Sequence, residues 1–460
     1  MRSAKYVIIN LLFLGLVQAQ PVPQSLKDKI QGAVDASHAN NGLKGVGVTV
    51  AFPNGAMWST SAGIISDGVP IDTSKYFRFA SYTKFLTSIM IMQLHESGQI
   101  SIDDSLKKYL FPIPNVDGDL TIRDLLRHTA TVGDYFQNAS AVVQQNPDSV
   151  FDTRQTLIDH IPGTTNPSKN YSYNNSNFNI LGLILEAVTG NSGVDEFDTR
   201  LTQPLALTDV HLAPVNLPSS ALNGTWFDPG SGLIDVGSVS VNGILTAHRY
   251  SGGAVGTTRG MLSILRAHLH NTYLNEETLQ LMNAPSPKNQ SYGLGTMIRN
   301  VAGDQLYGHG GATAQSTRTF YNPTNNIGVS VGINHSHSHA VESLFQNIYI
   351  LTRDELATLD VEAAFTPGRN FRLNQNYPNP FNPSTTISYE LSERSQVELV
   401  IYNVQGSEIW SVQYDAQDAG QHEIMWNGND RQNNSVETGI YFAQMTSEGE
   451  TQTIKLMLLK

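Results

Sequence analysis

Cysteine is absent from all 460 residues of this chain. Its absence excludes disulfide bonds, thiolate metal sites, a lipidated N-terminal cysteine and a thiol nucleophile. Any nucleophilic side chain must therefore attack through oxygen or nitrogen. The metalloprotease pattern His-Glu-x-x-His and the α/β-hydrolase pattern Gly-x-Ser-x-Gly are missing as well, so both of these hydrolase classes lack their usual motifs.

Positive charge is scarce, because 28 Lys and Arg residues face 40 Asp and Glu residues, for a net charge of −12. This balance argues against nucleic acid or an anionic membrane surface as a partner. We interpret the excess of negative charge as a contribution to solubility.

Long apolar runs are missing beyond the N-terminus. Arg2 and Lys5 precede an apolar stretch at residues 6–17, and Val17-Gln18-Ala19 fits a cleavage site with small residues. We therefore predict a signal peptide over residues 1–19 and a secreted or cell-surface protein. The stretch is short for a bilayer span, and we expect no transmembrane segment in the mature chain.

Helical and strand-like patterns alternate over residues 20–356. Val46, Val48 and Val50 alternate with small or polar residues before a Pro-Asn-Gly turn, which predicts a hairpin. Residues 85–95 are apolar nearly all round, which predicts a buried helix. A strand is expected at 327–333 and a helix at 341–352. Strands at both ends with helices between them predict an α+β domain built on an antiparallel sheet.

The pattern changes after this domain. Residues 357–372 lack clear periodicity and contain Pro367-Gly368, which indicates a linker. Residues 373–460 contain short alternating segments at 387–391, 397–401, 441–445 and 454–458, separated by turn signals. We predict that this last region forms a small β-sandwich.

The first candidate catalytic motif is Ser81-Tyr82-Thr83-Lys84. Positions three apart share one face of a helix, so the serine hydroxyl and the lysine amine can meet. Burial at the start of a helix favours a neutral amine, which can accept the serine proton. A second stretch, Ser105-Leu106-Lys107-Lys108, has the same spacing, but it follows two aspartates and no apolar run comes after it.

The second motif is Tyr173-Asn174-Asn175, in a polar loop before a helix expected from about residue 177 to Thr189, with Gly190 as its C-cap. Tyr173 can serve as a base only if a nearby ammonium lowers its pKa. Asn175 can hold the lysine and donate to a substrate carbonyl. The alternative is a capping asparagine beside an ordinary surface tyrosine.

The third motif is His309-Gly310-Gly311. Glycine lets a substrate lie against the backbone, where an N–H group can donate to a developing oxyanion, and the N–H of Ser81 would be the second donor. The alternative is a glycine-rich hairpin with an incidental histidine.

Taken in order, these motifs resemble the serine β-lactamases and penicillin-binding D-alanyl-D-alanine peptidases, chiefly the class C β-lactamase-like branch. The resemblance covers about residues 25–350 and includes the stretches 125–129, 181–186 and 251–255. It implies an antiparallel sheet flanked by helices, an all-helical subregion, and no cofactor or metal. It also implies roles for eight residues: Ser81 as acylated nucleophile, Lys84 and Tyr173 in proton transfer, Asn175 in orienting substrate, His309 in place of the usual lysine, Gly310 and Gly311 beside the substrate, and Ala312 N–H in the oxyanion hole.

Two departures from that family bear on the substrate. The usual middle threonine of the third motif, which helps to hold a substrate carboxylate, is Gly310 here, and the usual lysine is His309. We therefore leave three substrates open: a D-amino-acid peptide of the D-Ala-D-Ala type, a β-lactam, or an ester. A carboxylesterase on the same fold is the first alternative function.

The C-terminal sandwich resembles a type IX secretion sorting domain, through residues 376–383 and Thr438-Gly439-Ile440-Tyr441-Phe442. This resemblance implies an Ig-like sandwich, passage across an outer membrane, and the type IX secretion machinery as a partner.

Two further hypotheses belong to other classes. His335, His337 and His339 alternate and could bind zinc on a strand, although a solvated loop explains them more simply. A non-catalytic protein that binds peptidoglycan or peptide is possible on the same fold. The presence of Ser81, Lys84, Tyr173 and Asn175 together favours an enzyme.

Overall fold

The computed structural model describes residues 22–65, 68–163, 165–214, 226–227, 234–235, 241–336, 338–364, 371–376, 378–379, 381–391 and 393–459. The signal peptide predicted at residues 1–19 lies outside them. The chain divides into two compact units between Arg353 and Asp354, and we describe each unit by itself. No helix in the described ranges combines the length and the apolar character needed to cross a membrane.

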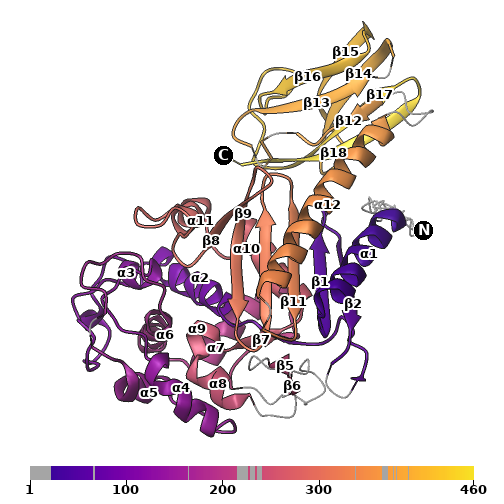
Figure 1. The fold of residues 1–460 in the computed structure, drawn as a ribbon. Coiled ribbons are helices and arrows are strands. Elements are labelled where there is room, and N and C mark those ends of the chain that lie inside the picture. Colours follow the sequence, from indigo (N-terminus) through magenta and orange to yellow (C-terminus); the bar gives the residue numbers. More distant parts are fainter. Residues whose placement is uncertain are drawn as a thin grey trace, which may run out of the picture. The chain divides into compact units, whose positions relative to one another are not determined.

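A six-stranded antiparallel sheet forms the centre of the first unit (Figure 1). Its strand order is β2 (Met57–Gly63), β1 (Gly45–Ala51), β11 (Ile327–Ile333), β10 (Ser316–Asn322), β9 (Asp304–Ala312) and β8 (Met297–Val301). β1 pairs with β11 near the other end of the unit, with Val48 opposite Val331. β1 also pairs with β2, with Val48 opposite Thr60, so the predicted hairpin is present. The predicted α+β fold class is confirmed.

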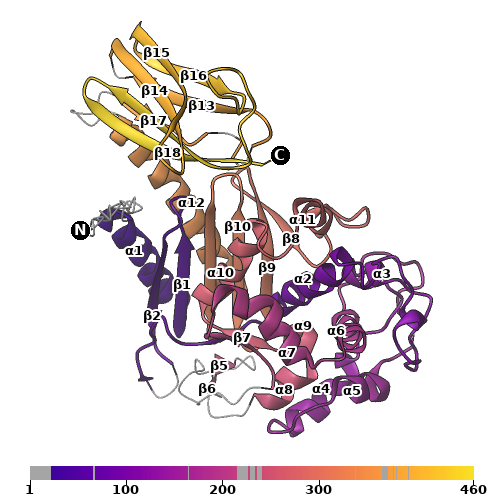
Figure 2. The same cartoon turned by 180° about the vertical axis from the view of Figure 1, so that it is seen from behind.

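Helices cover both faces of this sheet. Successive residues of a strand point to opposite faces. Thr319 lies against Met261 of α10 (Thr258–Leu269), and Phe320 packs 5.3 Å, ring to ring, from Phe345 of α12 (Ser338–Ala364). Figures 1 and 2 show α10 on one face, and α1 (Gln24–Asn41) with the start of α12 on the other.

The predicted all-helical subregion is built around α2 (Tyr82–Glu96), which packs on α6 (Asn175–Thr189) and α9 (Arg249–Gly252). Every residue of α2 from 82 to 92 is buried, as its apolar composition predicts. α6 starts two residues earlier than expected and ends at Gly190 with a left-handed φ of 74°. The other helices of this subregion are α3 (Ile122–Leu126), α4 (Phe136–Gln145), α5 (Thr153–His160) and α8 (Asn242–Ala247).

Shorter elements complete the first unit. A three-stranded sheet consists of β3 (Phe77–Arg78), β7 (Ala254–Gly256) and β4 (Val210–Leu212), and it leads the chain into α2. The remaining elements are η2 (Leu106–Lys108), α7 (Gly193–Phe197), η3 (Asp198–Thr202), η4 (Gln203–Leu205), β5 (Trp226–Phe227), β6 (Ile234–Asp235) and α11 (Glu276–Asn283).

The second unit is a β-sandwich with its own core. One sheet contains β12 (Phe371–Leu373), β13 (Thr385–Leu391) and β16 (Gly420–Trp426), and the other β15 (Glu408–Gln417), β14 (Ser395–Asn403), β17 (Gly439–Ser447) and β18 (Glu450–Leu458). Ile387, Leu399, Trp426 and Leu456 share one buried cluster. The four predicted strand segments lie inside β13, β14, β17 and β18.

The end of α12 differs from the sequence-based expectation. The helix continues to Ala364, so the first part of the segment that we predicted as a linker from residue 357 is helical. Residues 365–370, which include Pro367-Gly368, lie outside the described residues.

Candidate active site

Ser81 sits at the end of a strained turn directly before α2. The preceding residue, Ala80, has a φ of +47°, a conformation that residues with a side chain adopt rarely. Strand β9 packs closely against this turn: a Cβ at Gly311 would lie 2.1 Å from the carbonyl oxygen of Phe79. Only glycine fits there, which explains one glycine of the third motif. The turn thus brings Ser81 next to the end of β9.

Lys84 follows one helical turn later and is fully buried. Its Nζ lies 3.1 Å from Ser81 Oγ, 2.8 Å from Asn175 Oδ1 and 2.8 Å from the carbonyl oxygen of Ser251. Burial lowers the pKa of Lys84 to about 7, while the negative charge of Asp134 opposes this shift. The structure therefore brings together three of the residues singled out by sequence.

The three acceptors around Lys84 define how a neutral amine must be oriented. Asn175 Oδ1 and Ser251 O carry no hydrogen and can only accept. A neutral amine has two N–H groups and one lone pair, so its N–H groups point to these two oxygens and its lone pair faces the Ser81 hydroxyl. The amine is thus placed to receive the serine proton. The resulting ammonium can donate to all three oxygens.

Asp134 fixes the orientation of Asn175. Its Oδ2 accepts from the backbone N–H of Asn175 at 3.2 Å and from Nδ2 at 2.9 Å, so Oδ1 faces Lys84. A primary amide has two N–H groups, and this contact occupies one of them. The neighbour, Asn174, caps α6 by accepting from Ser176 N–H. The capping interpretation therefore holds for Asn174, while Asn175 belongs to the site.

Tyr173 differs from the expectation in the sign of its pKa shift. Its ring centroid lies 4.9 Å from Lys84 Nζ, so the two groups are neighbours as predicted. Although 38% of Tyr173 is exposed at the cavity, the loss of hydration around its phenol raises the pKa above its ordinary value, and a hydrogen bond with Ser81 offsets only part of that shift. The predicted lowering by a nearby ammonium is wrong, because the loss of hydration around the phenol has the larger effect on its pKa. Tyr173 is a protonated phenol that can donate.

His309 is buried and uncharged. Its Nδ1 lies 2.5 Å from the carbonyl oxygen of Gly310, which can only accept, so Nδ1 carries the ring proton. Nε2 then accepts from the hydroxyl of Tyr292 at 3.3 Å. Burial lowers the pKa of His309 to about 3. His309 therefore supplies no positive charge in place of the lysine.

Gly310 makes room for an arginine. A Cβ at this position would lie 2.9 Å from a guanidinium nitrogen of Arg318, the residue opposite it on β10. Arg318 is paired with Glu342, with 2.7 Å between Nε and Oε2. The place that the missing threonine would occupy is thus taken by a salt-bridged side chain.

A cavity of about 650 Å³ opens beside Ser81. Four residues predicted from sequence line it, namely Ser81, Tyr173, Asn175 and Ala312. His309, Gly310 and Gly311 are not among the described residues of its lining. The opposite wall is apolar and comes from α4, the turn after it, and α8: Phe136, Val143, Pro147 and Ile244. The cavity therefore combines a polar side, which contains Ser81 and the guanidinium of Arg78, with an apolar wall.

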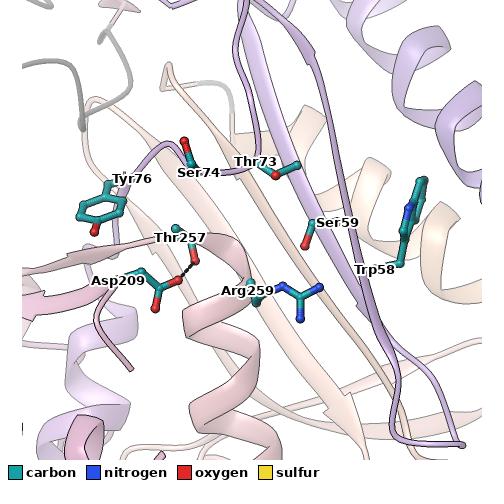
Figure 3. Close-up of a pocket in the computed structure, with 8 residues that line it drawn as sticks. All are labelled: Trp58, Ser59, Thr73, Ser74, Tyr76, Asp209, Thr257 and Arg259. Atoms are coloured by element: carbon teal, nitrogen blue, oxygen red, sulfur yellow. Dashed lines mark hydrogen bonds between the residues drawn. The ribbon is translucent and has the colours of Figure 1, made fainter. Parts of the chain in front are cut away.

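A second pocket of the first unit serves as a contrast (Figure 3). It has a volume of about 460 Å³, and Thr257 Oγ1 donates to Asp209 Oδ2 across it at 2.5 Å. Hydroxyl groups such as Ser59 and Ser74 line it, but the described lining contains no lysine or histidine that could act as their base. We therefore place the candidate active site at Ser81.

Three side chains or groups of this site were missed by sequence analysis. They come from loops or helices without a catalytic motif, and they are Asp134, the carbonyl of Ser251 and the apolar residue Phe136. The stretch 251–255 was noticed only as part of a resemblance, and a backbone carbonyl leaves no signal in residue type.

The histidine cluster does not form a common site among the described residues. His335 is buried and His339 is exposed, and His337 lies outside the described residues. Within the described ranges there is no group of three His, Asp or Glu side chains that could hold a metal ion.

Comparison with known proteins identifies two matching families. The model of the family described as β-lactamase matches residues 30–350, and the model of the FlgD Ig-like domain matches residues 379–450. A putative D-alanyl-D-alanine carboxypeptidase of Escherichia coli (strain K12) is 24% identical over 322 residues, which covers 60% of this chain and 72% of that protein. Protein flp of Staphylococcus aureus (strain COL) is 28% identical over 152 residues, covering 32% of this chain and 30% of that protein.

Solved structures give the same fold. The D-amino acid amidase from Ochrobactrum anthropi SV3, complexed with D-phenylalanine, aligns with a TM-score of 0.63 at 18% identity and covers 72% of this chain and 99% of that one. A penicillin-binding protein from Bacillus halodurans aligns with a TM-score of 0.58 at 25% identity, covering 70% and 99%. The first unit thus shares its fold with a D-amino acid amidase and with a penicillin-binding protein.

Proposed function

This chain belongs to the β-lactamase family of serine hydrolases, and we propose that it hydrolyses its substrate through an acyl-Ser81 intermediate. The observation that carries the proposal is the set of contacts at Lys84. Two acceptors that lack hydrogens fix its N–H groups, and the lone pair of the neutral amine faces Ser81 Oγ at 3.1 Å. A nucleophile within hydrogen-bond reach of an activated base is the arrangement that acyl transfer requires.

In the acylation step, Ser81 Oγ attacks the substrate carbonyl carbon and its proton passes to Lys84. The N–H groups of Ser81 and Ala312 are proposed as donors to the oxyanion, in keeping with the place of both residues on the cavity lining. Tyr173 then gives its hydroxyl proton to the leaving group and takes one from Lys84. The bond to the leaving group breaks, and the base is neutral again.

In the deacylation step, a water molecule attacks the acyl carbonyl. Its proton passes to Lys84, directly or through Tyr173, and Ser81 Oγ leaves as the ester bond breaks. Ser81 recovers its proton from Lys84. The pKa of about 7 suits both directions of transfer at neutral pH.

For the substrate, we propose a neutral amide or an ester with an apolar group. His309 is uncharged and Gly310 brings no hydroxyl, so the third motif offers little to a substrate carboxylate. The wall of Phe136, Val143 and Ile244 offers an apolar surface to an acyl group. A D-amino acid amidase is among the structural neighbours, and an amino acid amide has no C-terminal carboxylate. A carboxylesterase is the second candidate function, favoured by the same wall.

For localisation, we propose export directed by residues 1–19 and type IX secretion directed by residues 373–460. The sandwich and its match to an Ig-like domain support a sorting role without specifying the machinery. Expression in a host with this secretion system tests it. Deletion of residues 373–460 is expected to retain the protein in the periplasm, and unchanged release into the medium would reject the proposal.

The catalytic proposal is tested with the chain lacking residues 1–19. It is incubated separately with N-acetyl-D-phenylalanine amide, p-nitrophenyl butyrate, a D-Ala-D-Ala peptide and a chromogenic cephalosporin. We expect turnover of the first two substrates above the last two. Ser81→Ala is the inactive variant and Ser105→Ala its matched control. Binding of the peptide without turnover of any substrate would instead support a non-catalytic protein, and equal turnover by Ser81→Ala would reject the mechanism.

A further inference from the structure

His128 lies in the stretch 125–129, which has no part in the proposed chemistry so far. It follows α3 and is fully buried, with a φ of +56°. A residue with a side chain adopts this conformation at a cost, so the surrounding structure must hold it there. In this conformation the carbonyl and the imidazole of His128 contact the same short segment, residues 172–174.

The two contacts flank the candidate catalytic tyrosine. Ser172 N–H donates to the carbonyl oxygen of His128 at 2.8 Å, and Asn174 N–H donates to its Nδ1 at 3.1 Å. The backbone on each side of Tyr173 is thus held by one residue. The imidazole ring also packs against the Tyr173 ring, with centroids 4.4 Å apart. His128 therefore contacts both the ring of Tyr173 and the backbone on each side of it.

The imidazole must keep Nδ1 unprotonated to make these contacts. A second donor, Asn177 Nδ2, also reaches Nδ1 at 3.2 Å, so two N–H groups converge on one acceptor. Burial lowers the pKa of His128 well below its ordinary value, and a positive charge on nearby Lys84 adds to that shift. The acceptor therefore persists over the pH range in which Lys84 titrates.

Tyr173 in turn contacts both reacting side chains. Its ring lies 4.9 Å from Lys84 Nζ, and its hydroxyl is hydrogen-bonded with Ser81. We propose that His128 is a positioning residue, which holds the Tyr173 hydroxyl in place for proton transfer through its carbonyl and Nδ1. This inference rests on the proposed function. An error in position of about 1 Å can reduce a rate about 100-fold.

Two amide variants of His128 distinguish the effect of losing the hydrogen-bond acceptor at Nδ1 from the effect of losing the imidazole ring. In His128→Asn, the amide oxygen takes the place of Nδ1, and asparagine tolerates a positive φ. In His128→Gln, the amide reaches the place of Nε2 instead. We expect His128→Gln to lower kcat by about tenfold or more, with KM within about twofold, and His128→Asn to recover most of that loss.

His268 provides the matched control for loss of a buried imidazole. It is fully buried and packs edge-on against Phe85 at 5.0 Å, and it is not part of the described cavity lining. His268→Gln is expected to lower the melting temperature without changing kcat per folded molecule. A comparable loss of kcat in His268→Gln and His128→Gln would overturn the inference, because it would indicate general destabilisation.

A double-variant cycle tests whether His128 acts through Tyr173. If it does, His128→Gln adds little to the loss of kcat already caused by Tyr173→Phe. Independent, multiplying losses would contradict a role through the tyrosine. Kinetics are measured on p-nitrophenyl butyrate, with folded protein counted by near-ultraviolet circular dichroism.

Amide hydrogen exchange keeps the test independent of activity. In His128→Gln, the amides of Ser172 and Asn174 lose their acceptors or their alignment, and we expect exchange in residues 170–176 to be faster than in His128→Asn. If the wild-type chain turns over no substrate, the proposed function fails while this structural part is still decided. Equal exchange in the two variants and the wild type would overturn the positioning role.

Discussion

Two segments of the first unit contain a serine followed three residues later by a lysine, and their physical chemistry is opposite. Lys84 is fully buried, and burial lowers its pKa to about 7. Lys108 has a side chain that is 57% exposed, and it forms a salt bridge with Asp104 at 2.8 Å. The hydrogen bond with Asp104 raises the pKa of Lys108, so this amine stays charged.

The difference teaches that spacing alone brings two side chains together, whereas burial and the neighbouring acceptors decide what they can do. Ser105 precedes η2, a single short turn, and the acidic partner of Lys108 comes from the same surface stretch. Ser81 precedes a long helix that is buried on nearly every side. The atoms in contact with Lys84 Nζ are amide, hydroxyl and carbonyl oxygens and not a carboxylate, so no ion pair raises its pKa as it does for Lys108.

The largest effect on kcat is expected from replacing the serines of the two segments by alanine, one at a time. Ser81→Ala removes the nucleophile, and we expect kcat on p-nitrophenyl butyrate to fall about 1000-fold or more. Ser105→Ala is expected to leave kcat within about twofold of the wild type. Steady-state kinetics of the two purified variants check this, and similar losses in both would remove the distinction between the segments.

The second largest effect on kcat is expected from replacing the lysines of the two segments by methionine. Lys84→Met removes the base and leaves Asn175 Oδ1 and Ser251 O without their donor, so we expect a loss of kcat of about 100-fold or more together with a lower melting temperature. Lys108→Met should change neither quantity noticeably, because its salt bridge is exposed. An active Lys84→Met variant would show that another group accepts the serine proton.

Asp134 and Asp104 form the third comparison. Asp134→Asn weakens the hold on the Asn175 amide, and we expect kcat to fall about tenfold. The negative charge of Asp134 raises the pKa of Lys84, so its removal should also shift the rising limb of the pH–rate profile to lower pH. Asp104→Asn should alter neither. A shift to higher pH in Asp134→Asn would contradict the electrostatic account.

The pH profile of the wild type gives an effect of the same size without any substitution. Lys84 acts as a base only when it has lost its proton, so the rate should rise with pH through about 7 and level off above it. Between pH 8 and pH 6 we expect kcat/KM to fall about tenfold. The limb should be absent from residual activity in Lys84→Met. A rising limb only above pH 9 would mean that Lys84 is not desolvated in solution.

Much of this site could be predicted from sequence, because Ser81 and Lys84 are related by a local helical spacing and Asn175 belongs to a short motif. The groups that orient the lysine and its amide partner could not, because Asp134 lies in a loop and the Ser251 carbonyl in the short helix α9, and neither belongs to a catalytic motif. The pKa of Tyr173 was predicted in the wrong direction, since the loss of hydration around its phenol outweighs the influence of neighbouring groups.

The fold shows the same division. Strands with regular alternation, such as β1, β11 and β13, could be predicted, and so could the buried helix α2. β15 was missed although Trp410, Val412 and Tyr414 alternate with polar residues along it, and these side chains are only partly buried in the structure. The pairing of β1 with β11 joins strands from opposite ends of the unit, which no local pattern specifies.

The acceptors of Lys84 have a consequence for the timing of activity during folding. Asn175 and Ser251 lie 91 and 167 positions along the chain from the lysine. The amine is desolvated and oriented only when α2, α6 and the segment at α9 have all docked. A nascent or half-assembled chain therefore holds an ordinary ammonium and an unreactive serine. The enzyme is latent until it is complete, and the return of turnover during refolding reports the last tertiary contacts to form.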